Sequence, residues 1–156
     1  MNDELSRFFE KLNNSVGSGK YDDPRTINLK KIKIDSKVRN AVEKINCSSW
    51  VWTIFSCQGH RYKYSATTLP YFVFIVRNEH KAKFLEIIFD TLPSNDNEKF
   101  PLMGHSLEIQ CGMKDELFTV VTVYWSSAFV NSSPLLKQLH KNIDTMSERI
   151  LEHNYG

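Results

Sequence analysis

The feature that most constrains the fold is a short polar segment between two strand-like stretches near the end of the chain. Residues 106–111 alternate apolar and polar side chains, and residues 117–125 are rich in Val, Thr, Tyr and Trp, as β-strands commonly are. Only Gly112–Glu116 lies between them, which indicates a hairpin turn. Because a parallel connection needs a crossover of about a dozen residues or more, this pair predicts antiparallel strands and disfavours a doubly wound parallel sheet.

The rest of the chain alternates helical periodicity with strand-like runs. Aromatic and β-branched density predicts buried strands at 50–55 and 71–76. The basic segment that ends at Lys33 is compatible with one more short strand. Apolar side chains at helical spacing predict helices over 3–13, from Asp35 or Ser36 to Ile45, over 79–92, and from Ser133 to about residue 150.

This order of elements predicts an α+β fold. Two strand pairs, each preceded by a helix, favour a single mixed or antiparallel sheet with helices on one face, of which the ferredoxin-like arrangement is one form. The length of 156 residues suits one α+β domain over residues 1–156. Residues 1–33 then form an N-terminal extension made of a helix and a loop.

Composition excludes several classes of protein. No run of 18 apolar residues is present, and the acidic N-terminus is unlike a secretory signal, so we expect a cytoplasmic protein without a membrane partner. The cysteines Cys47, Cys57 and Cys111 are odd in number and lack the C-x-x-C spacing, which indicates reduced thiols and neither disulfides nor a metal site. A net charge of +2 is too small to indicate general duplex binding. We predict no cofactor.

One segment, directly after the first predicted strand, gathers most of the chemistry. Gly59 permits a positive φ, so the backbone N–H groups of its turn could face an anion, and Arg61 adds a guanidinium. Tyr62 and Tyr64 alternate with cations and offer rings on which a base could stack. The set is typical of a phosphate-and-base pocket. The candidate ligand-binding residues of this segment are Ser56, Cys57, Gln58, Gly59, His60, Arg61, Tyr62 and Tyr64.

Each of these residues also has a purely structural interpretation. Cys57 could be a small buried apolar side chain, Gly59 could serve only a hairpin turn, and the tyrosines could lie on the surface of the sheet. A nucleophilic role for Cys57 would need an identified base and a lowered thiol pKa, so we assign no catalytic residue.

Candidates outside this segment carry weaker signals. Tyr124 and Trp125 end the last predicted strand and would border the same site if both strand ends open on one edge; the alternative is that they close the core. His105 could pair with His60 as an acid and base. A basic run could contact phosphates or could simply be solvated, and it comprises Arg25, Lys30, Lys31 and Lys33.

The central part of the chain resembles a known family. Its pattern consists of Ile34-Asp35, a helix that ends in Ile45-Asn46, a strand, and then S-C-x-G-H at residues 56–60. This pattern is similar to the opening of the wybutosine-synthesising tRNA methyltransferase family, in which the last motif residue is typically Arg. It also resembles small bacterial and phage proteins in which S-C-x-G-H is followed by a strand like Pro70–Phe74.

The resemblance spans about residues 34–76 and implies an α+β fold with a nucleotide-type ligand near the S-C-x-G turn. Ser56, Cys57 and Gly59 match the methyltransferase motif, whereas His60 departs from its Arg. The second half of the chain shows no methyl-donor motif. The binding surface is therefore better supported by the resemblance than methyl transfer is.

Three functions follow as hypotheses. The first is a nucleotide- or RNA-binding module whose partner is a nucleotide or a short RNA. An Asn-, Lys-, Ile- and Phe-rich composition hints at an AT-rich genome such as phages carry, and a phage protein of this kind could sequester a nucleotide immune signal. The second is an enzyme on a nucleotide or tRNA, either a methyltransferase or a phosphodiesterase that uses His60 and His105. The third is a protein–protein interaction domain, and in any of these cases a homodimer is conceivable.

Overall fold

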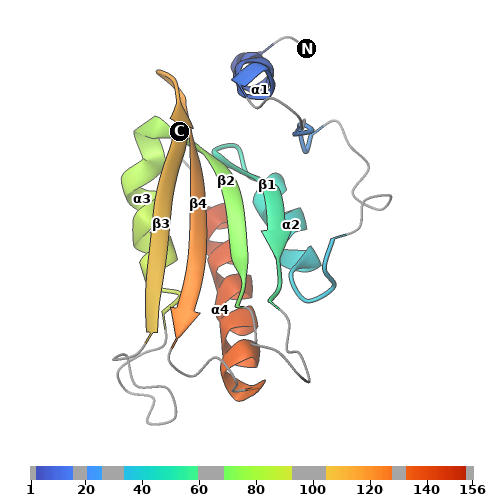
Figure 1. The fold of residues 1–156 in the computed structure, drawn as a ribbon, viewed down its shortest axis with the longest axis vertical. Helices are drawn as coiled ribbons and strands as arrows, with labels where there is room; N and C mark the ends of the chain where they lie inside the picture. The colour runs from blue at the N-terminus through green and yellow to red at the C-terminus, as the bar shows by residue number, and fades with distance from the viewer. Residues whose placement is uncertain are drawn as a thin grey trace.

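The fold is α+β and is built on one antiparallel sheet (Figure 1). The computed structural model describes residues 3–15, 21–25, 34–59, 69–92, 105–127 and 133–153. The four strands are β1 (Val51–Cys57), β2 (Tyr71–Arg77), β3 (His105–Lys114) and β4 (Phe118–Ser127), and they lie in the order β1-β2-β4-β3. Every neighbouring pair is antiparallel, so the prediction of an α+β fold with a single sheet is confirmed.

The β3–β4 hairpin exists as predicted, but its turn lies farther along the chain than 112–116. Gly112 continues β3, and the register shifts between Cys111 and Lys114. The turn itself is held by Asp115, whose carboxylate accepts the backbone N–H groups of Leu117 at 2.8 Å and Phe118 at 2.9 Å. The glycine that read as a turn signal is therefore part of an irregular strand pairing.

One connection crosses the sheet. From β2 the chain passes through the short 3-10 helix η1 (Asn78–His80) and α3 (Lys81–Phe89) to β3, and β4 lies between β2 and β3. Such a split β-α-β unit occurs in ferredoxin-like folds. The described elements run helix-helix-strand-strand-helix-strand-strand-helix, which differs from the β-α-β-β-α-β order of that fold.

Three helices cover one face of the sheet and enclose the main core. They are α2 (Arg39–Asn46), α3 and α4 (Ser133–Glu152), which lie behind the strands in Figure 1. Alternate residues of each strand point toward them, as Phe72, Phe74 and Val76 of β2 do. Trp50 anchors this core at one end, because its indole N–H donates to the carbonyl of Ile150 at 2.9 Å.

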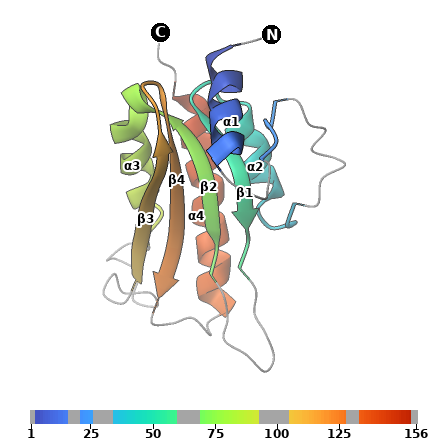
Figure 2. The same cartoon turned by 45° about the horizontal axis from the view of Figure 1, so that its top comes forward.

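The first helix, α1 (Glu4–Ser15), packs on the other face, which the prediction of helices on one face did not include. Its apolar side chains Leu5, Phe8, Phe9 and Leu12 meet strand residues that point away from the main core. Figure 2 shows α1 over the upper ends of the strands. The contact partners in the sheet are Trp52, Ile75, Phe118 and Val120. This second core covers the end of the sheet that carries the β3–β4 turn and leaves the other end of that face uncovered by α1.

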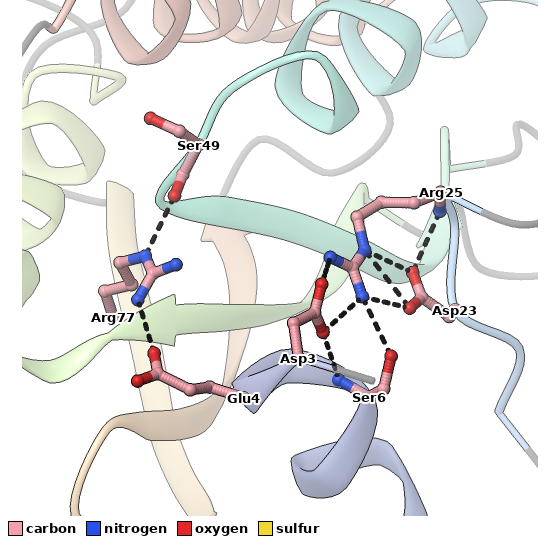
Figure 3. A network of polar contacts seen from close by, with 7 residues as sticks. All are labelled: Asp3, Glu4, Ser6, Asp23, Arg25, Ser49 and Arg77. Carbon is pink, nitrogen blue, oxygen red and sulfur yellow. Dashed lines mark hydrogen bonds and ion pairs between the residues drawn. The ribbon is translucent and has the colours of Figure 1, made fainter. Parts of the chain in front are cut away.

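A polar network ties α1 to the segment that follows it (Figure 3). Asp3 caps the helix by accepting the Ser6 N–H at 2.9 Å, and it also contacts the guanidinium of Arg25. Arg25 reaches Asp23 at 2.6 Å as well. Because Tyr21 is bonded to Asn13 near one end of α1 and Arg25 to Asp3 at the other, residues 21–25 run back along the helix. Beside this network, Arg77 of β2 donates to the Ser49 carbonyl at 2.9 Å and lies over the ring of Phe118.

Helix boundaries differ modestly from the predicted ones. The α2 helix begins at Arg39, after a turn in which the Val38 N–H donates to the Asp35 carbonyl at 3.1 Å. The predicted helix over 79–92 divides into η1 and α3. The extra strand considered before Lys33 lies outside the described residues. No helix within the described ranges has the length and apolar character needed to cross a membrane.

Candidate functional site

The end of β1 sends Ser56 and Cys57 to opposite faces of the sheet. Ser56 pairs with Phe72, which belongs to the main core, and Cys57 pairs with Tyr71, which points the other way. Both side chains are half-buried. Ser56 and Cys57, which both match the S-C-x-G motif, therefore cannot contact a ligand on the same face of the sheet.

The polar groups of Gln58 form hydrogen bonds with other parts of the fold. Its backbone N–H donates to the carboxylate of Asp35 at 3.1 Å, and its side-chain carbonyl accepts the Lys37 N–H at 2.9 Å. The Nε2–H of His140 donates to the Gln58 carbonyl at 2.7 Å. The N–H expected to face a ligand anion thus faces an internal carboxylate, and Gln58 acts here as a link between β1, the start of α2 and α4.

Gly59 has a φ of 78°, the conformation expected of a glycine in this turn, and it is buried. The rest of the predicted segment cannot be compared with the structure. His60, Arg61, Tyr62 and Tyr64 lie outside the described residues, and their role in ligand binding stays a prediction.

Tyr124 and Trp125 are neighbours in sequence, but they point to opposite faces of β4. Trp125 is 4% exposed, packs edge-on against Phe72, and donates its indole N–H to the Thr91 hydroxyl at 2.7 Å. This placement favours the alternative interpretation of Trp125, in which its ring closes the main core. Tyr124 is half-buried on the other face, the face that α1 covers only in part.

On that face, three rings from three neighbouring strands form an aromatic row: Phe55 of β1, Tyr71 of β2 and Tyr124 of β4. The ring centroids of Phe55 and Tyr71 lie 5.3 Å apart with planes inclined by 22°. Those of Tyr71 and Tyr124 lie 5.4 Å apart and are inclined by 24°. Both pairs are stacked, so the rings are held in a common orientation across the sheet.

The row remains accessible to solvent. Phe55 is 46% exposed, although it is a large apolar side chain within a strand. The register places Glu108 of β3 directly opposite Tyr124, and Gln110 opposite Thr122. Cys57, Tyr71, Tyr124 and Glu108 therefore form one line across all four strands on this face.

Tyr71 keeps its proton at physiological pH. Burial raises the pKa of its phenol above the ordinary value, and nearby Cys57, Tyr124 and Asp35 act in the same direction. A neutral phenol can donate its O–H and presents no charge to an anionic ligand. The row therefore offers stacking surface without a phenolate at its centre.

Among the remaining candidate residues, Arg25 has carboxylate partners within the fold, and the side chains of the others lie outside the described part of the chain. Arg25 contacts the carboxylates of Asp3 and Asp23. His105 begins β3, opposite Ser127, but its side chain is outside the described part, as are Lys30, Lys31 and Lys33. Within the described residues no group of His, Cys, Asp and Glu side chains could hold a metal ion.

A shallow hollow of about 750 Å³ lies at the opposite end of the sheet, between α1 and the β3–β4 turn. Its charges have both signs, and the ammonium of Lys11 lies 3.6 Å from the carboxylate of Asp115 across it. None of the candidate residues lines it. We therefore place the candidate site at the aromatic row.

Sequence reasoning selected Tyr124 but missed Phe55 and Tyr71. In β2, the residues that alternate with the main core are Tyr71, Val73 and Ile75. The hydroxyl of Tyr71 was therefore a signal in the sequence that this position lies outside the core. In β1 the register shifts between Thr53 and Phe55, which obscures the alternation that would have assigned Phe55 to the open face.

Comparison with known proteins adds little to this description. No protein-family model and no curated protein matches the chain. A solved structure, "Structure of PH1069 protein from Pyrococcus horikoshii", is similar over 95% of this chain and 91% of its own, with a TM-score of 0.44 and 12% sequence identity. A likeness of that size carries no functional argument.

Proposed function

We propose that the protein is a nucleotide- or RNA-binding module and that bases stack on the aromatic row. The observation that carries this proposal is the stacked row of Phe55, Tyr71 and Tyr124 on three adjacent strands, in which Phe55 is exposed and both tyrosines are half-buried. A contiguous, partly exposed aromatic surface commonly marks a binding site. A nucleobase has a π-face of matching size and is a suitable partner for such a surface.

The architecture supports a base as that partner. Single-stranded RNA is commonly bound on the face of a four-stranded antiparallel sheet, with two or three bases stacked on aromatic side chains of its strands. This chain has a sheet of the same strand number, with its rings at one end of the open face. Because Tyr71 is stacked between its two neighbours, the outer faces of Phe55 and Tyr124 are the ones left for bases. Stacking contributes roughly 1–3 kcal/mol per base, so these two faces suit a dinucleotide or a short single strand.

Phosphate binding is assigned to the segment that follows β1. His60 and Arg61 supply the cationic donors in this proposal, and they remain sequence-based expectations. Cys57 lies in line with Tyr71 and Tyr124, which brings the end of β1 to the border of the row. A ligand bound at the Phe55 end of the row would have its phosphate near the end of β1.

The test is binding to a panel of cyclic dinucleotides, mononucleotides and short RNAs, measured by titration calorimetry and by fluorescence anisotropy. Phe55→Ala and Tyr71→Leu remove a ring while leaving the sheet apolar, and each should weaken binding roughly 5- to 150-fold. Phe89→Ala is the matched control, because Phe89 is 54% exposed on α3, behind the sheet. Thermal melts of all variants check that the fold is kept.

The outcomes separate the candidate functions. Absence of binding across the panel, or equal binding by wild type, Phe55→Ala and Tyr71→Leu, would overturn the proposal. Ring-dependent association of the chain with itself would favour a protein interface instead. Recovery of a chemically changed ligand after denaturation would favour the enzyme alternative.

A cytoplasmic setting fits this function. The described structure contains Cys47, Cys57 and Cys111 as free thiols, which a reducing compartment maintains. Capture of a nucleotide immune signal by a phage protein is the specific form of this proposal. It would appear as tight binding of an intact cyclic dinucleotide in the same panel.

A further inference from the structure

We propose that Glu108 and Gln110 make the aromatic row selective for guanine; this inference rests on the proposed function and specifies its ligand. Both side chains belong to the edge strand β3 and lie at the Tyr124 end of the row. Each is exposed. Glu108 is paired directly with Tyr124, and Gln110 lies two residues further along the same face of β3.

The register fixes this placement. Glu108 is paired with Tyr124, and Gln110 with Thr122, so all four side chains share one face of the sheet. Side chains paired in this way have Cβ atoms about 4.5–5.5 Å apart. A base that stacks on Tyr124 and extends beyond its ring toward the sheet edge would therefore present its own edge to Glu108.

The two side chains are also joined to each other. The Gln110 amide N–H donates to Oε1 of Glu108 at 2.9 Å. This bond orients the carboxylate and uses one acceptor site of Oε1, so Oε1, Oε2 and the amide carbonyl of Gln110 can each accept a further hydrogen bond. The end of the row thus presents a group of acceptors beside a stacking ring.

Acceptors of this kind discriminate among the bases. Guanine has two adjacent donors on its Watson–Crick edge, N1–H and the N2 amino group, which a carboxylate can accept together. Adenine and cytosine offer an amino group next to a ring nitrogen with a lone pair, and uracil offers one N–H between two carbonyls. Each of those would place an acceptor against the carboxylate, which is unfavourable.

Charge favours the same assignment. A carboxylate repels a phosphate, so Glu108 is suited to a base edge and unsuited to the sugar-phosphate backbone. The phosphate then lies toward the β1 end of the row, away from Glu108. The row would thereby orient its ligand, with guanine toward β3 and phosphate toward β1.

The experiment compares GMP, IMP, AMP, CMP and UMP by titration calorimetry at constant salt. IMP is the key probe, because it differs from GMP only in lacking the N2 amino group. We expect wild type to prefer GMP over each of the others by roughly 5- to 150-fold. Glu108→Gln should remove most of the preference for GMP over IMP, while binding of IMP changes little.

Glu116→Gln is the matched control, because it makes the same charge change at an exposed residue of the β3–β4 turn, at the other end of the hairpin. If wild type bound all five nucleotides equally and Phe55→Ala weakened that binding, guanine selection would be overturned while the proposed function stands. An unchanged preference in Glu108→Gln would also overturn it. Absence of binding by any nucleotide or short guanine-containing RNA would overturn both proposals.

Discussion

The carboxylate of Asp35 accepts the backbone N–H of Gln58 at 3.1 Å, and the side chain of Gln58 in turn accepts the backbone N–H of Lys37 at 2.9 Å. Asp35 and Gln58 are 23 positions apart in sequence, and these two hydrogen bonds join the chain segments to which they belong. The pair links the end of β1 to the turn before α2. It fixes the backbone immediately before Gly59, where the chain leaves the sheet with a positive φ.

Removal of this carboxylate should destabilise the fold. Asp35→Ala leaves the partly buried Gln58 N–H without its acceptor, which should cost roughly 1–3 kcal/mol of unfolding free energy. Asp35→Asn keeps a carbonyl oxygen and should cost less. Urea denaturation measures both, with the exposed Asp22→Ala as the control. If Asp35→Ala and Asp22→Ala had equal midpoints, the Asp35–Gln58 contact would contribute nothing.

The buried hydrogen bond between Trp125 and Thr91 should show strong coupling. Thr91→Val removes the hydroxyl that accepts the Trp125 indole N–H, which should cost roughly 1–3 kcal/mol because that donor stays buried. Trp125→Phe removes the donor but also loses packing in the main core. In the double variant the Thr91→Val change should cost less than it does alone. A double-mutant cycle by urea denaturation measures this, and strict additivity would disprove the coupling.

The contact between Arg25 and Asp3 should make stability depend on pH in the acid range (Figure 3). Hydrogen bonds from Arg25, and then from the Ser6 N–H, hold the pKa of Asp3 well below its usual range. The unfolded state therefore binds more protons as pH falls through about 4, so this stabilisation is present above that pH and is lost below it. Added salt should weaken the contact, because the Asp3 side chain is 32% exposed.

Arg25→Gln tests this dependence. Its deficit in unfolding free energy relative to wild type should be largest near neutral pH and should shrink as pH falls below about 4. Arg7→Gln, which makes the same charge change at an exposed position of α1, should show a smaller deficit. A deficit for Arg25→Gln that stayed constant from pH 7 to pH 3 would show that Arg25 does not act through carboxylate titration.

Much of the fold is readable from local patterns because each element satisfies its own periodicity. The density of β-branched and aromatic residues predicted the strands around Phe74 and Val121, and helical spacing predicted the inward faces of α1 and α4. Local patterns do not show which face of the sheet each element covers. Phe8 packs against Phe118 with ring centroids 5.4 Å apart, although the two residues are far apart in sequence. No local pattern encodes such a contact.

The candidate site was only partly predictable for the same reason. Tyr71 begins a run that reads as uniformly buried, yet α1 covers only part of that face, so Tyr71 is left half-buried. The Gln58 N–H looked available because its acceptor, Asp35, comes from a distant turn. Trp125 resembled a site residue by type, and only its burial against Phe72 and its bond to Thr91 identify it as a core residue.

The histidine at the end of α4 should make stability sensitive to mild acid. Burial lowers the pKa of His153, and the positive charges of His80 and Lys83 add to that effect. The His153 ring packs edge-on against Trp50 with centroids 4.7 Å apart. Because the unfolded state has the higher pKa, it binds more protons below about pH 6.5, so stability is complete above that pH and declines as pH falls toward the folded-state pKa.

Variants at the two histidines separate the causes of this decline. His153→Gln should flatten the fall in unfolding free energy between pH 7.5 and 5.5, measured by urea denaturation with Trp fluorescence. His80→Gln should restore only the smaller part, because burial is the larger cause of the lowered pKa. A wild-type curve as flat as that of His153→Gln, or full restoration by His80→Gln alone, would contradict the assignment of burial as the dominant cause.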